Sequence, residues 1–202
     1  LTKLGAGRLT LTSATANTYS GTTTVAEGVL TVDGSLAGPV NVIGGTFNGG
    51  VSGMPAVVAG AVTVAGGEFS AGSRNTQTAV DGNNGNGIGQ MNLGAGLTWN
   101  GGSTLVFDFA STTGFGTEGT DWDFLDITGT LAIASNSSNK ITLFVDSWSD
   151  LNTYGSVATF DSDSTGSGFP TPSYQWLWAE TDGITDGTNT LSGDLTDYFI
   201  ID

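Results

Sequence analysis

Three aspartates close together in the second half of the sequence have a spacing that could serve hydrolytic chemistry. Asp121, Asp123 and Asp126 stand beside the strand expected to begin at Leu125. Most glycoside hydrolases need two carboxyl groups held about 5 to 9.5 Å apart, and these spacings could supply such a pair. The same acids also suit the solvated margin of a strand. Because nothing selects one pair among the fifteen acids of residues 101–202, we prefer the second interpretation and predict no catalytic residues.

Other catalytic chemistries lack the side chains that they need. The chain has neither histidine nor cysteine, which excludes Ser-His-Asp and Cys-His triads and zinc sites of the usual type. A lyase acting on an acidic polysaccharide needs a base and several cations. The whole supply is four residues scattered along the chain, Lys3, Arg8, Arg74 and Lys140. A polysaccharide-degrading enzyme is therefore the least favoured class of function, and we expect no enzymatic activity.

Residues 161–166, Asp-Ser-Asp-Ser-Thr-Gly, have the spacing of the first half of a calcium-binding loop. Oxygen-bearing side chains stand at its first, third and fifth positions, and glycine stands at the sixth. The twelfth position is Pro172 rather than glutamate, and no helices are expected beside it. Calcium binding at Asp161 and Asp163 stays an alternative to an ordinary acidic loop. We predict no metal or cofactor site, and we expect diffuse cation binding by the acidic half ahead of one tight site.

Two further segments suit the binding of a glycan or of a partner surface. Tyr174, Trp176 and Trp178 alternate, so they share one face of an expected strand and could stack on sugar rings. Residues 73–90 form a polar Gly/Asn-rich loop that leaves the surrounding pattern, and such loops often carry specific function. Each segment has a plainer interpretation, as part of an apolar core and as a tolerated insertion respectively. We favour the plainer interpretation in both cases.

A repeat with a period near twenty residues organises the elements that must position these side chains. Residues 25–30, Val-Ala-Glu-Gly-Val-Leu, recur in altered form at 42–47 and 64–69, with offsets of 17 and 22 residues. Such a period is typical of a solenoid, in which each coil buries its apolar side against the next. Two interior columns are predicted, namely Val25, Val42 and Val64, and Leu30, Phe47 and Phe69. A positive φ is predicted at the glycine that precedes each second strand, namely Gly28, Gly45 and Gly67.

Short strands are expected along the rest of the chain. Alternation of apolar residues predicts them at residues 9–12, 105–109, 125–133, 141–145, 157–160, 174–178 and 198–201, with a corner at Gly129 and no helix anywhere. We divide the chain into two parts. Residues 1–135 are β-solenoid coils with the loop excursion 73–90, and residues 136–202 are an acidic, aromatic-rich C-terminal β region that continues or caps the solenoid.

The first 32 residues resemble a known family, the passenger-associated repeat of autotransporter proteins. The matching residues are Lys3, Gly5, Gly7, Leu9, Leu11, Asn17, Tyr19, Ser20, Gly21, Thr23, Val25, Gly28 and Leu30. Residues 66–72, 102–108 and 125–131 look similar to the family more weakly. Arg8 departs from the pattern, since a small or β-branched residue is usual there. The resemblance implies a right-handed parallel β-helix that is exported and displayed at or beyond the cell surface, and it implies a scaffold without catalytic activity.

Charge is distributed unevenly. Residues 1–100 carry a net charge of −1 and residues 101–202 carry −14, which together make the −15 of the chain. A field of this sign repels nucleic acid and anionic lipid, so neither is expected as a partner. The sequence contains no run of eighteen apolar residues, so no membrane-spanning helix is expected.

These observations predict an all-β, extracellular or bacterial cell-surface protein with a structural role. Both ends of the expected solenoid look uncapped, and open coils tend to dock on one another. Two explanations stay open: the chain is a fragment of a longer passenger, or copies of it assemble head to tail into a fibre. We favour assembly. The alternative in the binding class is an adhesin module that recognises glycans or a partner surface, and the alternative in the enzyme class is the polysaccharide-degrading enzyme described above.

Overall fold

The computed structural model describes residues 1–12, 17–50, 54–73, 87–109, 117–147, 179–186 and 198–201. Regular structure in these ranges is all β-strand, as predicted, and no helix occurs among them. The strands are β1 (Thr2–Lys3), β2 (Arg8–Thr12), β3 (Thr23–Val25), β4 (Val29–Asp33), β5 (Ser35–Leu36), β6 (Val40–Val42), β7 (Thr46–Gly49), β8 (Ala56–Val58), β9 (Val62–Val64), β10 (Glu68–Ser70), β11 (Gln90–Leu93), β12 (Leu97–Asn100), β13 (Thr104–Phe109), β14 (Phe124–Ala134), β15 (Ile141–Ser147), β16 (Ala179–Thr185) and β17 (Phe199–Ile201).

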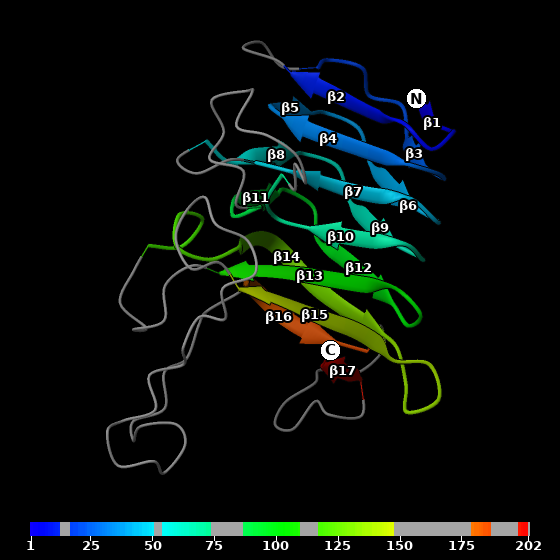
Figure 1. The fold of residues 1–202 in the computed structure, drawn as a ribbon, viewed down its shortest axis with the longest axis vertical. Coiled ribbons are helices and arrows are strands. Elements are labelled where there is room, and N and C mark those ends of the chain that lie inside the picture. Colours follow the sequence, from blue (N-terminus) through cyan, green and yellow to red (C-terminus); the bar gives the residue numbers. More distant parts are fainter. Residues whose placement is uncertain are drawn as a thin grey trace.

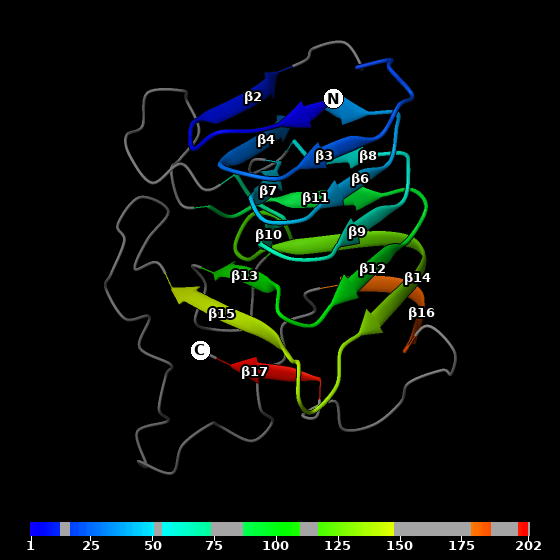
Figure 2. The same cartoon turned by 90° about the vertical axis from the view of Figure 1, so that its right-hand side faces the viewer.

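The described strands form two parallel sheets (Figure 1). The first sheet runs in the order β17-β15-β13-β10-β7-β4-β2. The second sheet is built from two files of strands that meet in the long β14. One file, β5, β8 and β11, leads into the first half of β14, and the other, β1, β3, β6, β9 and β12, leads into its second half. On each pass the chain visits the first sheet and then the two files in the same order (Figure 2).

Both predicted interior columns are confirmed by the strand register. Val25 pairs with Val42 and Val42 with Val64, while Leu30 pairs with Phe47 and Phe47 with Phe69. All six side chains are fully buried. Fully burying one such side chain contributes about 1.5–3 kcal/mol. Each coil therefore gains its stability chiefly from the coils directly above and below it.

Aromatic rings fill the middle of the core. Phe47 and Phe69 stack with ring centroids 5.9 Å apart, and Phe69 meets Trp99 edge to face at 5.6 Å. Trp99 pairs in register with Val64 on one side and Ile133 on the other, so it continues the valine column. The column starts at Lys3, which pairs with Val25 and is 6% exposed. The Lys3 ammonium donates hydrogen bonds to the carbonyl oxygens of three residues, Leu4 (3.1 Å), Gly5 (2.6 Å) and Glu27 (3.0 Å).

The corner glycines are needed for two different reasons. Gly28 and Gly67 have φ of 63° and 73°, which confirms the predicted positive φ at these two corners. The prediction is wrong for Gly45, which does not adopt a positive φ. A Cβ atom on Gly45 would lie 2.7 Å from the carbonyl oxygen of Gly28 and 2.9 Å from Cγ1 of Val25. At that corner the close approach of the preceding coil, and not the backbone conformation, excludes a side chain.

Connection length varies mainly at one corner of the coil. The four connections from the second file to the first sheet between β3 and β13 are three residues long, and so are those between the two files at 37–39, 59–61 and 94–96. The connections that leave the first sheet are far more unequal. Counted along the sequence to the next described strand, they span one residue after β4, six after β7, nineteen after β10, fourteen after β13 and thirty-one after β15. We call these connections the variable corner.

Several predicted boundaries need correction. The excursion expected at 73–90 ends earlier, because Gln90 already belongs to β11. The strand expected at 125–133 is β14, and at Gly129, with φ of 97°, it continues through a register shift instead of ending in a corner. The expected strands at 157–160 and 174–178 lie outside the described residues. β15 and β17 add in parallel to the first sheet and β16 adds to the second, so the described part of residues 136–202 continues the same sheets.

Candidate functional site

The three aspartates from which a hydrolytic pair could have been drawn lie in different environments. Asp121 is half-buried in a turn, where its Oδ2 accepts a hydrogen bond from the Thr117 N–H at 2.7 Å. Asp126 is half-buried on β14, in register with Asn92 and Glu180 of the neighbouring strands. Asp123 is buried, with 2% of its surface exposed.

Asp123 joins three neighbouring strand ends at the variable corner. Its Oδ1 accepts the N–H of Gly89, just before β11, at 2.9 Å. Its Oδ2 accepts the N–H of Asp108 on β13 at 3.1 Å and lies 3.3 Å from the donating hydroxyl of Ser70 on β10. The backbone N–H of Asp123 in turn donates to the carbonyl oxygen of Asp108 at 2.8 Å. The side chain therefore fixes two successive coils to each other where they pass the variable corner.

Asp108 is the second acid of this site, and the sequence analysis did not single it out. It is fully buried on β13, and its carboxyl group packs against the backbone of Gly87. A Cβ atom on Gly87 would lie 2.8 Å from Oδ2 of Asp108, and Gly87 has a positive φ of 72°. The signal was present in the sequence, because Asp108 interrupts the apolar run Leu-Val-Phe-Asp-Phe at 105–109.

Burial has the largest effect on the protonation of Asp123. Loss of hydration, and then the neighbouring charge of Asp108, raise the pKa of the Asp123 carboxyl well above its usual value. The hydrogen bonds from Asp108, Gly89 and Ser70 favour the charged form and act in the opposite direction. The net effect favours the protonated form of the Asp123 carboxyl group.

This arrangement suits a structural role better than a catalytic one. A carboxyl group with a raised pKa is a suitable general acid, but it must reach the proton acceptor on a substrate. Asp123 is almost completely enclosed, and both of its oxygens are already held by the protein's own donors. We therefore interpret the Asp108–Asp123 pair as a latch that holds the variable corner together.

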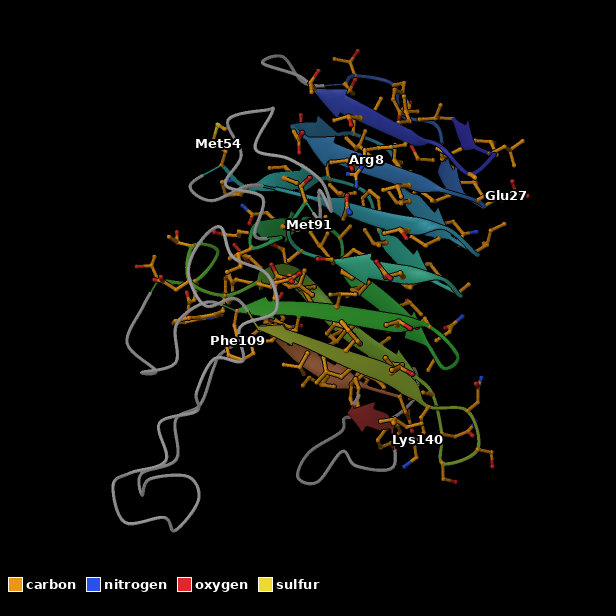
Figure 3. The ribbon with its side chains drawn as sticks, in the orientation of Figure 1. Arg8, Glu27, Met54, Met91, Phe109 and Lys140 are labelled. Carbon is orange, nitrogen blue, oxygen red and sulfur yellow. The ribbon has the colours of Figure 1, made fainter. Side chains whose placement is uncertain are left out.

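Polar side chains on neighbouring strands of the first sheet form a row on the face opposite the column of Leu30, Phe47 and Phe69. Nη1 of Arg8 donates to Oγ1 of Thr31 at 2.7 Å, and Thr31 donates to Oδ1 of Asn48 at 2.8 Å. Thr31, Asn48 and Ser70 are consecutive in register and at most 1% exposed. Arg8, which departs from the family pattern, therefore serves the packing of this face. Arg8 and Lys140 lie at opposite ends of the stack, so the structure does not gather them into a binding site for an anionic sugar (Figure 3).

The other candidate residues lie outside the described part of the chain. These are Asp161 and Asp163 of the calcium loop, and Tyr174, Trp176 and Trp178 of the aromatic strand. Within the described residues, no three His, Cys, Asp or Glu side chains are grouped closely enough to hold a metal ion. The described residues also include no helix that is long and apolar enough to cross a membrane.

Comparison with known proteins identifies the N-terminal repeat. The family model described as the passenger-associated-transport-repeat matches residues 1–32, which confirms the resemblance found in the sequence. No curated protein matches the chain, and no solved structure matches it.

The matched repeat residues have clear structural tasks. Asn17 bridges to Ser35, its backbone N–H and its side-chain amide both donating to the Ser35 carbonyl oxygen at 3.0 and 3.1 Å. The Tyr19 hydroxyl lies 2.8 Å from Oγ1 of the buried Thr23. Gly28 lies so close to the carbonyl oxygens of the coil above that no side chain fits. The repeat thus encodes one coil and its docking onto the next.

Proposed function

We propose that the chain is a non-enzymatic structural scaffold of an exported, surface-displayed protein, folded as a right-handed parallel β-helix. The observation that carries this proposal is the register of the two sheets. Interior columns continue from β1 through β14 in one sheet and from β2 through β15 in the other without losing register. The match to a passenger repeat over residues 1–32 supports export and surface display.

Repeated stacking of this kind favours a rigid rod. Each coil contacts only its neighbours, so the length of the rod can grow while the cross-section stays constant. Right-handed winding is favoured because crossover connections between parallel strands of one sheet are right-handed in about 98% of cases. A buried latch of two acids and a core of valine and aromatic columns are features that hold such a rod together.

The proposal also includes head-to-tail self-assembly of the scaffold. β2 and β17 each pair with only one described strand, and so do β1 and β16, so each end of the described stack presents strand edges. Such edges can pair with another copy. Ile200, 51% exposed on β17, lies at one of these edges.

Electron microscopy at increasing protein concentration tests this proposal. Ile200→Lys should shorten or abolish filaments by placing a charge at the edge. Val57→Lys is the matched control, because Val57 is 38% exposed on β8 within the stack. Monomeric particles of wild type at every concentration would contradict head-to-tail assembly, whereas particles without an elongated shape would contradict the scaffold itself.

An adhesin remains the second candidate function. The observation that favours it is the variable corner, where connections of nineteen, fourteen and thirty-one residues leave neighbouring coils. Binding residues often lie on loops of variable length that a rigid scaffold positions. A glycan array comparing wild type with Trp176→Ala would test this function, since loss of a specific signal in the variant is required to support it.

A further inference from the structure

One face of the molecule differs from the rest in being regular and uncharged. On the second file of strands, buried residues such as Thr23 and Val25 alternate with residues that point outward. From β3 onward the outward residues fall in one register column, Thr24, Asn41, Thr63, Thr98, Ala132 and Thr185. All six are half-buried and reach the surface. Their strands, β3, β6, β9, β12, β14 and β16, follow one another down one side of the stack (Figure 2).

Small uncharged residues flank this column on both sides. One side has Ala26, Ile43, Ala65, Asn100 and Ala134. The other side has Thr22, Pro39, Ala61, Thr130 and Gly183. All of these positions are exposed or half-buried. We call the three columns together the threonine face.

The threonine face contains no charged and no aromatic side chain, although the chain has a net charge of −15. Three described acids, Glu27, Asp182 and Asp186, stand directly beside its residues in the sequence. Glu27 accepts a hydrogen bond from the Gly5 N–H at 2.9 Å, and Asp182 accepts one from the Gly129 N–H at 2.8 Å. Both carboxylates are thus engaged by the backbone beside the face.

The composition of the face argues against the commoner partners. Without charges it offers nothing specific to an ionic ligand, and without aromatic rings it offers no platform on which sugar rings stack. Cores of protein–protein interfaces are enriched in aromatic residues, methionine and arginine. The threonine face has mainly threonine, alanine, asparagine and glycine. Ile43 is its one strongly exposed large aliphatic residue, and Leu4, which is 65% exposed, follows β1 beyond the first strand of the face, so a second protein would bury little apolar area there.

The threonine face presents hydroxyl and methyl groups to water at a regular interval. Neighbouring strands lie about 4.7–4.9 Å apart, so hydroxyl and methyl groups recur at that interval along the column. Threonine is restricted at χ1, which fixes both groups relative to the strand. Each hydroxyl can donate one and accept two hydrogen bonds, and each methyl group constrains the water around it. An array of this kind would present surface water with hydrogen-bonding and apolar groups in a repeating arrangement.

We propose that the threonine face binds ice. Each threonine contributes weakly, but the rows engage together because the backbone ladder fixes their spacing, as in other multivalent contacts. Ala132 is the one interruption of the polar column, since every other position in it is threonine or asparagine. The proposal goes beyond the scaffold function and does not require filament formation.

The test is the partition of the purified full chain into slowly growing ice, measured by absorbance of the melted ice and of the remaining liquid. Wild type is enriched in the ice. Thr63→Lys lowers this enrichment by about tenfold or more, because its ammonium must give up hydration at the ice contact. Thr46→Lys is the matched control, a half-buried threonine on β7 of the other sheet, and it keeps wild-type enrichment. Ala132→Thr raises the enrichment by completing the column.

Circular dichroism of each variant verifies that the fold is unchanged. Three results would overturn the proposal: wild type excluded from ice, Thr63→Lys and Thr46→Lys behaving alike, or sedimentation showing that Thr63→Lys dissociates a dimer that covers this face. Ile200→Lys separates this proposal from self-assembly, since it should affect filaments and leave ice partition unchanged.

Discussion

Replacing Gly67 by alanine tests how closely successive coils must approach one another. Gly67 has φ of +73°, and a Cβ atom there would overlap the carbonyl oxygen of Gly45 in the preceding coil. That oxygen cannot easily move, because it accepts the Glu68 N–H at 3.0 Å. The left-handed conformation costs an alanine about 1–2 kcal/mol, and overpacking against fixed atoms costs about 1–3 kcal/mol. We therefore expect Gly67→Ala to lower the free energy of unfolding by about 2–5 kcal/mol.

Substitutions at two further glycines separate the cost of the left-handed backbone conformation from the cost of overpacking. Gly45→Ala carries only the packing cost, about 1–3 kcal/mol, because its φ is not positive. Gly21→Ala is the control, since no atom lies within 4 Å of its added Cβ and its φ is not positive. It should leave the chain unchanged or stabilise it by about 0.4–1 kcal/mol through the unfolded state.

Urea unfolding followed by tryptophan fluorescence measures these differences, since Trp99 is fully buried in the core. The midpoint should fall in the order Gly21→Ala, Gly45→Ala, Gly67→Ala, with similar slopes. If Gly67→Ala unfolds at the same urea concentration as Gly21→Ala, the close stacking of corners described above is wrong.

Three other variants test the core, the acid latch and its pH dependence. Trp99→Ala should cost about 3–5 kcal/mol in urea unfolding followed by circular dichroism, because it removes the ring that continues the valine column, and a loss below that of Gly45→Ala measured in the same way would contradict this. Ser70→Ala should cost about 1–3 kcal/mol by removing a hydroxyl from the buried Asp123 carboxyl; stability equal to that of wild type would show that this contact contributes nothing. Because burial raises the pKa of Asp123 in the folded chain, that state binds the proton more tightly than the unfolded chain, so stability should rise as pH falls from the raised pKa toward about 4. Urea midpoints at pH 5 and pH 7.5 should show this slope in wild type and Asp126→Asn and a smaller one in Asp123→Asn, and equal slopes in all three would exclude Asp123 as the cause.

The sequence predicted the stacking well because stacking depends on a periodic signal. Val25, Val42 and Val64 recur with an apolar partner at a fixed distance, and each lies where that spacing places it. Strand type and the absence of helix in the described residues follow from the same short β-branched runs. The φ of Gly45 could not be read in this way, since a glycine required by a neighbouring coil looks the same in sequence as one required by its own backbone.

The acid latch was missed because its members are far apart in sequence. Ser70, Gly89, Asp108 and Asp123 meet only after two successive coils have stacked, with connections of nineteen and fourteen residues between the strands involved. Asp123 was placed among solvated acids because Asp121 and Asp126 share its surroundings in sequence. The threonine column was equally hidden, since single threonines in short strands gain meaning only once their register is known.

The most direct test of the account is a pair of engineered disulfides, which the chain permits because it has no cysteine of its own. Thr24 and Asn41 are register partners on adjacent strands, whereas Thr24 and Thr63 are two strands apart. Disulfides need Cα atoms about 4.4–6.8 Å apart, which adjacent strands satisfy and alternate strands do not. Mild oxidation should therefore close an intramolecular bond in Thr24→Cys/Asn41→Cys and none in Thr24→Cys/Thr63→Cys, as read by mass spectrometry. A bond in the second variant and none in the first would contradict the stacked parallel coils on which every proposal above depends.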